Sequence, residues 1–327
     1  MVTSRDVAQH AGVSQATVSR VLSSATSIAP ATRARVLAAM SELGYVPHAG
    51  AQAMKTRRTN VIGVVVDDLR NPFYSQLLDE LTRILNEHHY RVVVWNAGSS
   101  SHVDALAAIQ ESAVDGVVFT TATADSPELQ AAVGRGLPLL LINREVDGLD
   151  CDRVTGENTA GGTLVADFLV GRGRTDVAII AGSHAATTSR QRTEAFFARM
   201  AELGHPVPEH LRFDGKFSHD LAAEITRRLM SRAERPRAIF CLNDYMAFGA
   251  LDALRDLGIG PEECWVIGYD DVDMASWASY DLTTVRQSSH EMATAGAAML
   301  MERLADPHRL AQALRFPSTL IERGSTP

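Results

Sequence analysis

The chain has 327 residues, more than one hydrophobic core usually organises, so two or more domains are expected. Hydrophobic residues make up 46% and charged residues 21%, as in ordinary globular proteins. No signal-peptide pattern and no run of 18 apolar residues occurs, which argues against secretion and membrane insertion. Cys151, Cys241 and Cys264 are too widely spaced to indicate a disulfide framework or a zinc site. We therefore expect a cytoplasmic protein without a metal.

The charge is unevenly distributed along the chain. The net charge is -8, yet residues 1–60 hold seven basic and two acidic residues and so carry +5. The remainder therefore carries -13. A basic N-terminal segment before an acidic body is typical of a nucleic-acid-binding module joined to a domain with another role.

Residues 3–22 have the pattern of two short helices joined by a tight turn. Thr3 and Asp6 occupy the capping-box positions of the first helix, Gly12 suits the turn, and Ser14 can cap the second helix. This is the helix-turn-helix pattern, whose second helix lies in the DNA major groove. A helical hairpin with no role in DNA binding would give the same pattern.

A third helix is expected after Pro30 and is ended by Gly44. Its apolar stripe is predicted to consist of Val36, Leu37, Met40 and Leu43. We take residues 1–46 as the DNA-binding domain and 47–59 as a hinge or linker. The small and basic residues of that segment fit either a plain linker or a weak helix that forms only on DNA.

From Asn60 onward, apolar strand-like runs alternate with helical segments. The first series has strands at 61–66, 91–95, 116–119 and 137–142, and the second has strands at 177–181, 211–213, 238–242 and 264–268. A last helix, 289–304, and strand-like pieces follow. The predicted fold is a small all-α helix-turn-helix headpiece plus an α/β core of two parallel-sheet subdomains.

Three segments carry a resemblance to a known family: DVAQHAGVSQATVSRVL, TRARVLAAMSELGYVP and AQAMK. Together, residues 3–58 resemble the headpiece of the lactose-repressor (LacI/GalR) family. The rest of the chain is similar to the effector-binding core of that family, which is periplasmic-binding-protein-like. The resemblance implies an N-subdomain of about 60–158 and 288–316 and a C-subdomain of about 159–287 and 317–327, with crossings near 158, 287 and 317.

The resemblance also implies roles in DNA binding. Gln15, Ala16 and Arg20 would read bases, and the chemistry agrees, since Arg pairs with guanine, Gln with adenine and Ala with the thymine methyl. Five hydroxyl residues would contact the DNA backbone: Thr3, Ser14, Thr17, Ser19 and Ser23. Ala51, Met54 and Lys55 would enter the minor groove, where Met54 stands in place of the leucine of many members as the wedge between base pairs.

Ligand-binding residues are expected just after strands or at helix starts, where parallel sheets bind their ligands. The candidates at family pocket positions are Phe73, Tyr74, Arg190, Phe217, Asn243 and Asp270. Their charged and amide groups suit sugar hydroxyls and their aromatic faces suit sugar C–H surfaces. We predict that Arg190 contacts the ligand and Arg192 is structural. Phe73 could instead be a core residue, and Asn243 could instead cap a helix.

These features predict a sequence-specific DNA-binding transcriptional regulator, a repressor, that is controlled by a sugar or sugar derivative. A homodimer on a near-palindromic double-stranded operator is expected, because no heptad extension follows LIERGSTP. The alternatives are a repressor that depends on a purine-type co-repressor and a sugar-binding transport-type protein. No catalytic motif, metal set or cofactor motif is visible, so neither an enzyme nor a cofactor is expected. In the cell, the protein would associate with the nucleoid when bound to DNA.

Overall fold

The computed structural model describes residues 2–22, 28–46, 58–96, 102–111 and 113–327. The chain forms two compact units, residues 1–59 and 60–327. The predicted hinge residues Ala51, Met54 and Lys55 and the predicted phosphate contact Ser23 lie outside the described residues.

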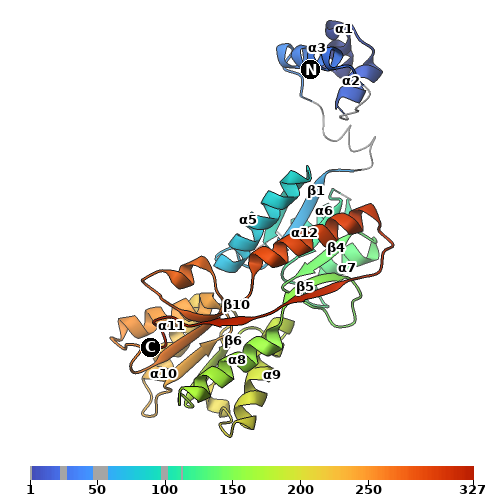
Figure 1. Cartoon of the computed structure of the whole chain (residues 1–327). Helices are drawn as coiled ribbons and strands as arrows, with labels where there is room; N and C mark the ends of the chain where they lie inside the picture. Colours follow the sequence, from blue (N-terminus) through green and yellow to red (C-terminus); the bar gives the residue numbers. More distant parts are fainter. Residues whose placement is uncertain (1, 23–27, 47–57, 97–101, 112) are drawn as a thin grey trace. The chain divides into compact units, whose positions relative to one another are not determined.

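The N-terminal unit contains three helices, α1 (Ser4–Ala11), α2 (Gln15–Leu22) and α3 (Pro30–Glu42) (Figure 1). The predicted capping box is confirmed: the Thr3 side chain accepts a hydrogen bond from the backbone N–H of Asp6, whose carboxylate accepts one from the backbone N–H of Thr3. Gly12 ends α1 with φ 63°, in the left-handed region where glycine is favoured. A small core of apolar residues joins the helices: Val7, Ala8, Ala11, Val18, Val21, Val36 and Ala39.

One residue of the predicted stripe on the third helix does not face this core. Leu37 is 50% exposed, whereas Val36 and Ala39 are buried. Successive residues of a helix point about 100° apart, so Leu37 directly follows Val36 but leaves its face. Met40 and Leu43, at helical spacing from Val36, do pack against the core.

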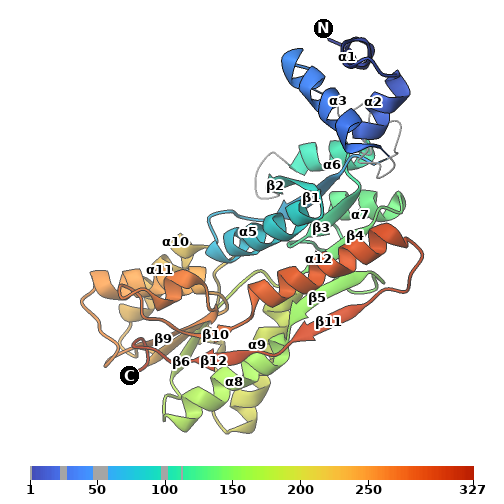
Figure 2. The same cartoon turned by 45° about the horizontal axis from the view of Figure 1, so that its top comes forward.

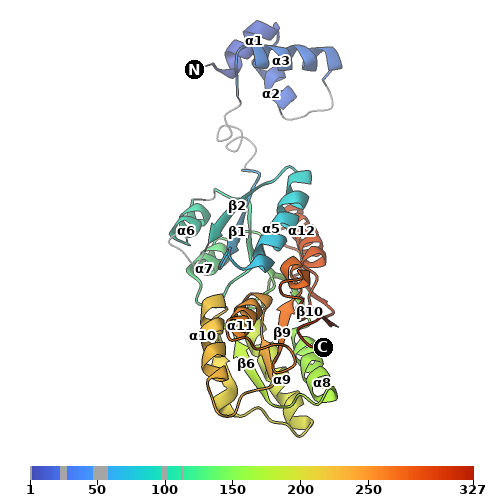
Figure 3. The same ribbon diagram turned by 90° about the vertical axis from the view of Figure 1, so that its left-hand side faces the viewer.

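The first half of the larger unit is built on an all-parallel sheet with strand order β11-β5-β4-β3-β1-β2. Its strands are β1 (Val61–Val66), β2 (Arg91–Asn96), β3 (Gly116–Phe119), β4 (Leu139–Ile142), β5 (Asp152–Gly156) and β11 (Ala313–Phe316). Figure 3 shows helices on both faces, with one pair consisting of α5 (Pro72–Glu87) and α12 (Ser289–Ala305) and the other of α6 (His102–Gln110) and α7 (Pro127–Gly134).

The central strand β1 is apolar throughout because helices cover both of its faces. Ile62 and Val64 join the hydrophobic cluster that includes Leu77 of α5, while Val65 joins the cluster that includes Ala105 of α6. Alternate side chains of a strand point to opposite faces, so a strand covered on both sides must be apolar at every position.

The second half has the strand order β12-β10-β9-β8-β6-β7. Its strands are β6 (Val177–Ala181), β7 (Arg212–Asp214), β8 (Ala238–Cys241), β9 (Trp265–Asp270), β10 (Thr283–Arg286) and β12 (Thr319–Ile321), of which only β12 is antiparallel to its neighbour. Helices α8 (Asn158–Gly171) and α9 (Thr187–Glu202) pack together, as do α10 (His219–Met230) and α11 (Asp244–Asp256). The 3-10 helices Glu209–Leu211 and Asp273–Ser276 complete this half.

The chain passes between the two sheets three times (Figure 2). The passages lie between β5 and α8, between β10 and α12, and between β11 and β12. The first and third passages are tied together, because the backbone N–H of Glu157 donates to the carbonyl of Phe316 and the Ser318 hydroxyl donates to the carbonyl of Glu157. The predicted headpiece and two-subdomain core are confirmed.

In the part of the chain that the structure describes, no helix is long and apolar enough to cross a membrane.

Candidate effector and DNA-binding sites

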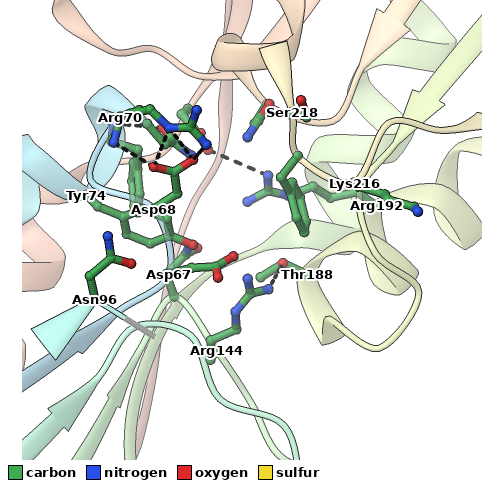
Figure 4. Close-up of a pocket in the computed structure, with 16 residues that line it drawn as sticks. Asp67, Asp68, Arg70, Tyr74, Asn96, Arg144, Thr188, Arg192, Lys216 and Ser218 are labelled. Atoms are coloured by element: carbon green, nitrogen blue, oxygen red, sulfur yellow. Dashed lines mark hydrogen bonds and ion pairs between the residues drawn. The ribbon is translucent and has the colours of Figure 1, made fainter. Parts of the chain in front are cut away.

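A cavity of about 300 Å³ lies where the two halves of the core meet (Figure 4). The first half contributes residues that follow β1, β2 and β4, among them Asp67, Asp68, Tyr74, Asn96, Asn143 and Arg144. The second half contributes residues of α9 and residues at the ends of strands, among them Thr188, Arg192, Lys216, Phe217, Asn243 and Asp270. Most of these lie at or just after the carboxyl ends of strands, the usual position of a ligand in open parallel sheets.

Aromatic side chains form opposite sides of the cavity. Phe73 and Tyr74 begin α5 and lie edge to face, with ring centroids 5.7 Å apart. Phe217 comes from the other half and adopts φ 56°. Its ring occupies the space beside Gly182, where any Cβ would lie 2.1 Å from the ring. The predicted residues Phe73, Tyr74 and Phe217 all line the cavity, and Phe73 is also part of the core.

Arg192 and Asp270 form a buried pair of opposite charges beside the cavity. Arg192 is 3% exposed, its Nη1 lies 3.6 Å from Oδ1 of Asp270, and its guanidinium stacks over the ring of Tyr269 at 3.5 Å. It also donates to Oδ1 of Asn158 and to the carbonyl of Leu242. Burial raises the pKa of Asp270 to about 7, although the Arg192 guanidinium opposes this shift.

The prediction for the two neighbouring arginines does not match this geometry. Arg190 does not line the cavity; its Nη2 donates to the exposed carboxylate of Asp147 at 2.8 Å, and its Nη1 donates to the carbonyls of His184 and Ala185. Two residues apart on a helix means about 200° of rotation, so only one of the two arginines can face inward. The structure brings Arg192 to the cavity and leaves Arg190 at the rim.

Asn143 and Arg144 line the cavity but are not among the predicted residues. Nη1 of Arg144 donates to the Thr188 hydroxyl at 2.6 Å across the cavity, and its guanidinium lies 5.7 Å from the Phe217 ring centroid (Figure 4). Both follow β4 directly, so the rule that ligand residues follow strands would have found them.

Two lining residues hold buried polar atoms without a hydrogen-bond partner among the described residues: Oδ1 of Asn143 and Nη2 of Arg192. Buried polar atoms are nearly always paired. An unpaired acceptor and an unpaired donor on residues that line one cavity favour a polar ligand that supplies both kinds of group.

Asn243 combines the two roles considered for it, helix cap and cavity residue. Its side chain caps α11 by accepting from the backbone N–H of Met246 at 2.9 Å, and the residue also lines the cavity.

In the smaller unit, the predicted base-reading residues Gln15, Ala16 and Arg20 are all exposed on α2. Ser14 caps this helix by accepting from the backbone N–H of Thr17 at 3.1 Å. Thr3 is also exposed, and Ser19 is half-buried. Gln15 is held by Ser4, to whose hydroxyl its Nε2 donates at 2.9 Å. One face of α2 is therefore free of core contacts, as a helix entering a groove requires.

The sequence matches two family profiles. Residues 3–48 match the profile described as "Bacterial regulatory proteins, lacI family", and residues 166–326 match the "Periplasmic binding protein-like domain". Among curated relatives, the ribose operon repressor of Escherichia coli (strain K12) is 32% identical over 99% of this chain and 100% of its own length. The transcriptional repressor PurR of Vibrio cholerae (strain M66-2) is 30% identical over 99% and 97% of the two chains.

Solved structures agree with these matches. The Lac repressor dimer bound to operator and the anti-inducer ONPF has a TM-score of 0.85 and 25% identity, covering 99% of both chains. A LacI family regulator from Enterococcus faecium with bound ribose has a TM-score of 0.73 and 27% identity, covering 81% of this chain and 98% of that one. Since similarity to the ribose operon repressor extends over both compact units, this chain belongs to the lacI family of bacterial regulatory proteins.

Proposed function

We propose that the protein is a DNA-binding transcriptional repressor whose effector is a neutral sugar of about monosaccharide size. The observation that carries this proposal is the combination, in one chain, of a helix-turn-helix unit with a polar, aromatic-lined cavity between two parallel-sheet halves. We also propose that effector binding changes the angle between the halves and thereby the affinity for the operator, which requires a difference in effector affinity between the two states.

The lining supports a sugar in three ways. Carboxylates and amides alternate with arginines, which suits hydroxyl groups that both donate and accept. Aromatic rings on opposite sides suit the C–H faces of a sugar ring. The volume of about 300 Å³ lies at the small end for ligand pockets.

The charges of the cavity favour a neutral effector. Asp67, Asp68 and Asp270 stand against Arg70, Arg144 and Arg192, and Arg70 is already paired with Asp68 at 2.8 Å. Figure 4 shows the end of Lys216 directed away from the cavity. An anionic group such as a phosphate would therefore meet as many carboxylates as guanidinium groups.

For the DNA complex we propose a homodimer on a near-palindromic operator, located in the cytoplasm with the DNA. Gln15, Ala16 and Arg20 would contact base edges, and four hydroxyl residues, the exposed Thr3 and Ser14 and the half-buried Thr17 and Ser19, would contact phosphates. The Lac repressor, solved as a dimer on its operator, supplies the analogy for this arrangement.

The proposal is tested by operator selection followed by ligand screening on the purified full chain. We expect a palindromic sequence to be selected from random duplexes, with a salt-dependent affinity. Arg20→Ala should weaken this binding by about 1–3 kcal/mol and relax the preference at one base pair, whereas Arg35→Ala on the exposed side of α3 should leave the preference unchanged.

The ligand screen uses thermal shift and calorimetry with neutral sugars, sugar phosphates and purine bases. Neutral sugars should stabilise the protein and alter operator affinity. If only a purine binds, the effector is a purine-type co-repressor and not a sugar. If no DNA sequence is selected, the proposal of a sequence-specific regulator is wrong.

Effector binding should depend on pH near neutrality. Burial raises the pKa of Asp270 to about 7 in the free protein, so the carboxylate is largely protonated at pH 6 and ionised at pH 8. The ionised form accepts stronger hydrogen bonds from hydroxyls, so sugar affinity should rise from pH 6 to pH 8. Calorimetric titrations across this range, with Asp270→Asn as the control, should show the rise in the wild-type protein only.

A further inference from the structure

The Asp270 carboxylate reaches the cavity from an unfavourable backbone conformation. Asp270 has φ 121° and Asp271 has φ 57°, both in the region that favours glycine, yet neither residue is glycine. Such conformations persist only where the surrounding structure fixes them. Contacts with neighbouring segments must therefore keep this dipeptide in place.

Asp244, the first residue of α11, contacts the chain on both sides of the dipeptide. Its Oδ2 accepts a hydrogen bond from the backbone N–H of Val272 at 2.9 Å. Its Oδ1 lies against Gly268, where an added Cβ would be 2.2 Å away. The same Oδ1 accepts from the Thr284 hydroxyl of β10 at 2.5 Å, which fixes the carboxylate itself. Asp244 is fully buried and does not line the cavity.

Other contacts act on the dipeptide itself. Asp270 pairs with Arg286 where β9 meets β10, and its carbonyl accepts from the backbone N–H of Gln287 at 3.4 Å. Gln287 Nε2 donates to Asp270 at 2.6 Å, and Arg286 and Arg323 donate to the Asp271 carboxylate at 2.5 and 2.6 Å. The side-chain bonds direct the carboxylates, and pairing with β10 fixes the backbone of Asp270. Asp244 bonds the backbone just after the dipeptide at Val272 and lies against Gly268 before it.

We propose that Asp244 is a positioning residue for effector binding: without touching the effector, it holds the backbone around Asp270 so that the Asp270 carboxylate faces the cavity. This inference rests on the proposed function, because effector contact at Asp270 is part of that proposal. The Asp244 side chain is suited to the task, since its two oxygens reach two partners at once, the Val272 N–H and the Thr284 hydroxyl.

Thr284→Val tests the inference with a close control in the same strand. The change removes the hydroxyl that fixes Asp244 while keeping the side-chain shape. If the backbone conformation that directs Asp270 into the cavity is then populated in about a tenth of the molecules, the affinity for the chosen probe, D-ribose, should fall about tenfold. Thr283→Val removes an equally buried hydroxyl of β10 that bonds Thr326 and the backbone of Arg323 and not Asp244, so it should cost clearly less D-ribose affinity than Thr284→Val.

Asp244→Ala should have a larger effect, because it removes both oxygens and leaves the Val272 N–H and the buried Thr284 hydroxyl without this partner. Crystal structures of both variants without sugar give a readout that does not depend on the choice of ligand. We expect the Asp270 carboxylate to leave its position in Asp244→Ala. Thr284→Val keeps the test decisive if Asp244→Ala does not fold.

Two results would overturn the inference: an unchanged Asp270 in the variant crystals, or equal losses of D-ribose affinity in Thr283→Val and Thr284→Val. Either would make Asp244 a stabilising residue only. If the wild-type protein binds no D-ribose or any other sugar, the proposed effector class fails, and the position of Asp270 in the crystals alone decides the inference.

Discussion

Arg192→Ala should abolish the response to effector while the protein still binds operator DNA. The change removes the Nη2 group that has no partner in the described structure and leaves the buried Asp270 without its nearby cation. Truncating one partner of a buried charge pair in a binding site costs about 2–5 kcal/mol, or more than about 30-fold in affinity. Calorimetry with the sugar that binds the wild-type protein measures this loss directly.

Arg190→Ala is the matched control for this variant. Its guanidinium pairs with Asp147, a carboxylate that is 83% exposed, and exposed ion pairs contribute about 0–1 kcal/mol. Sugar affinity should therefore stay close to that of the wild-type protein. A larger loss in Arg190→Ala than in Arg192→Ala would reassign the ligand contact to the rim. Retained operator binding shows that the variants are folded.

The choice between these arginines could have been made from the sequence. Ser189, Arg192, Phe196 and Met200 lie at helical spacing and are all buried in α9. Phe196 and Met200 mark the inward stripe of this helix, and Arg192 falls on that stripe four residues before Phe196. The resemblance to the family directed attention to the position, but periodicity carried the better information about which side chain faces inward.

Elements with strong periodic patterns were predicted well. Strand β1 and strand β3 have the predicted bounds, because continuous apolar runs bounded by polar residues have few other structures available. The capping box of α1 was equally readable, since it depends on residues three apart. Such features depend on residues that are close together in the sequence, so they can be predicted from the sequence alone.

Strands β5 (DRVTG) and β10 (TTVR) were not predicted as strands, because both carry several polar residues. Their polar side chains are satisfied by distant parts of the chain: Thr284 bonds Asp244, and Asp152 bonds Arg303. The same limit applies to the cavity. Contacts such as Arg144 with Thr188 join residues 44 positions apart, and no local pattern encodes them.

Arg303→Ala should give the largest loss of stability in the core. In α12, its Nε and Nη2 donate to the two carboxylate oxygens of Asp152 at 2.9 and 3.2 Å, and the Asp152 side chain is 0% exposed. Removing one partner of a buried ion pair leaves an uncompensated charge and costs about 3–5 kcal/mol. Urea denaturation should show this decrease in the free energy of unfolding.

Arg309→Ala is the control for loss of an arginine in the same region. Arg309 pairs with Glu302, whose side chain is 63% exposed, and donates to the carbonyl of Met299, so the loss should be about 1–2 kcal/mol, less than for Arg303→Ala. Equal losses for the two variants would show that burial of the partner does not set the cost.

Adding Asp152→Ala to Arg303→Ala separates the two contributions of the pair. It removes the buried charge and should restore part of the stability, as expected when the unpaired carboxylate rather than the missing bond dominates the loss. Recovery should be incomplete. Arg303 also donates to the carbonyls of Pro307 and Leu310, and Asp152 accepts from the backbone N–H of Gln312, so the pair fixes the segment that leads into β11. Because β11 precedes the third passage between the sheets, loss of this anchor should also alter sugar affinity in the Arg303→Ala protein.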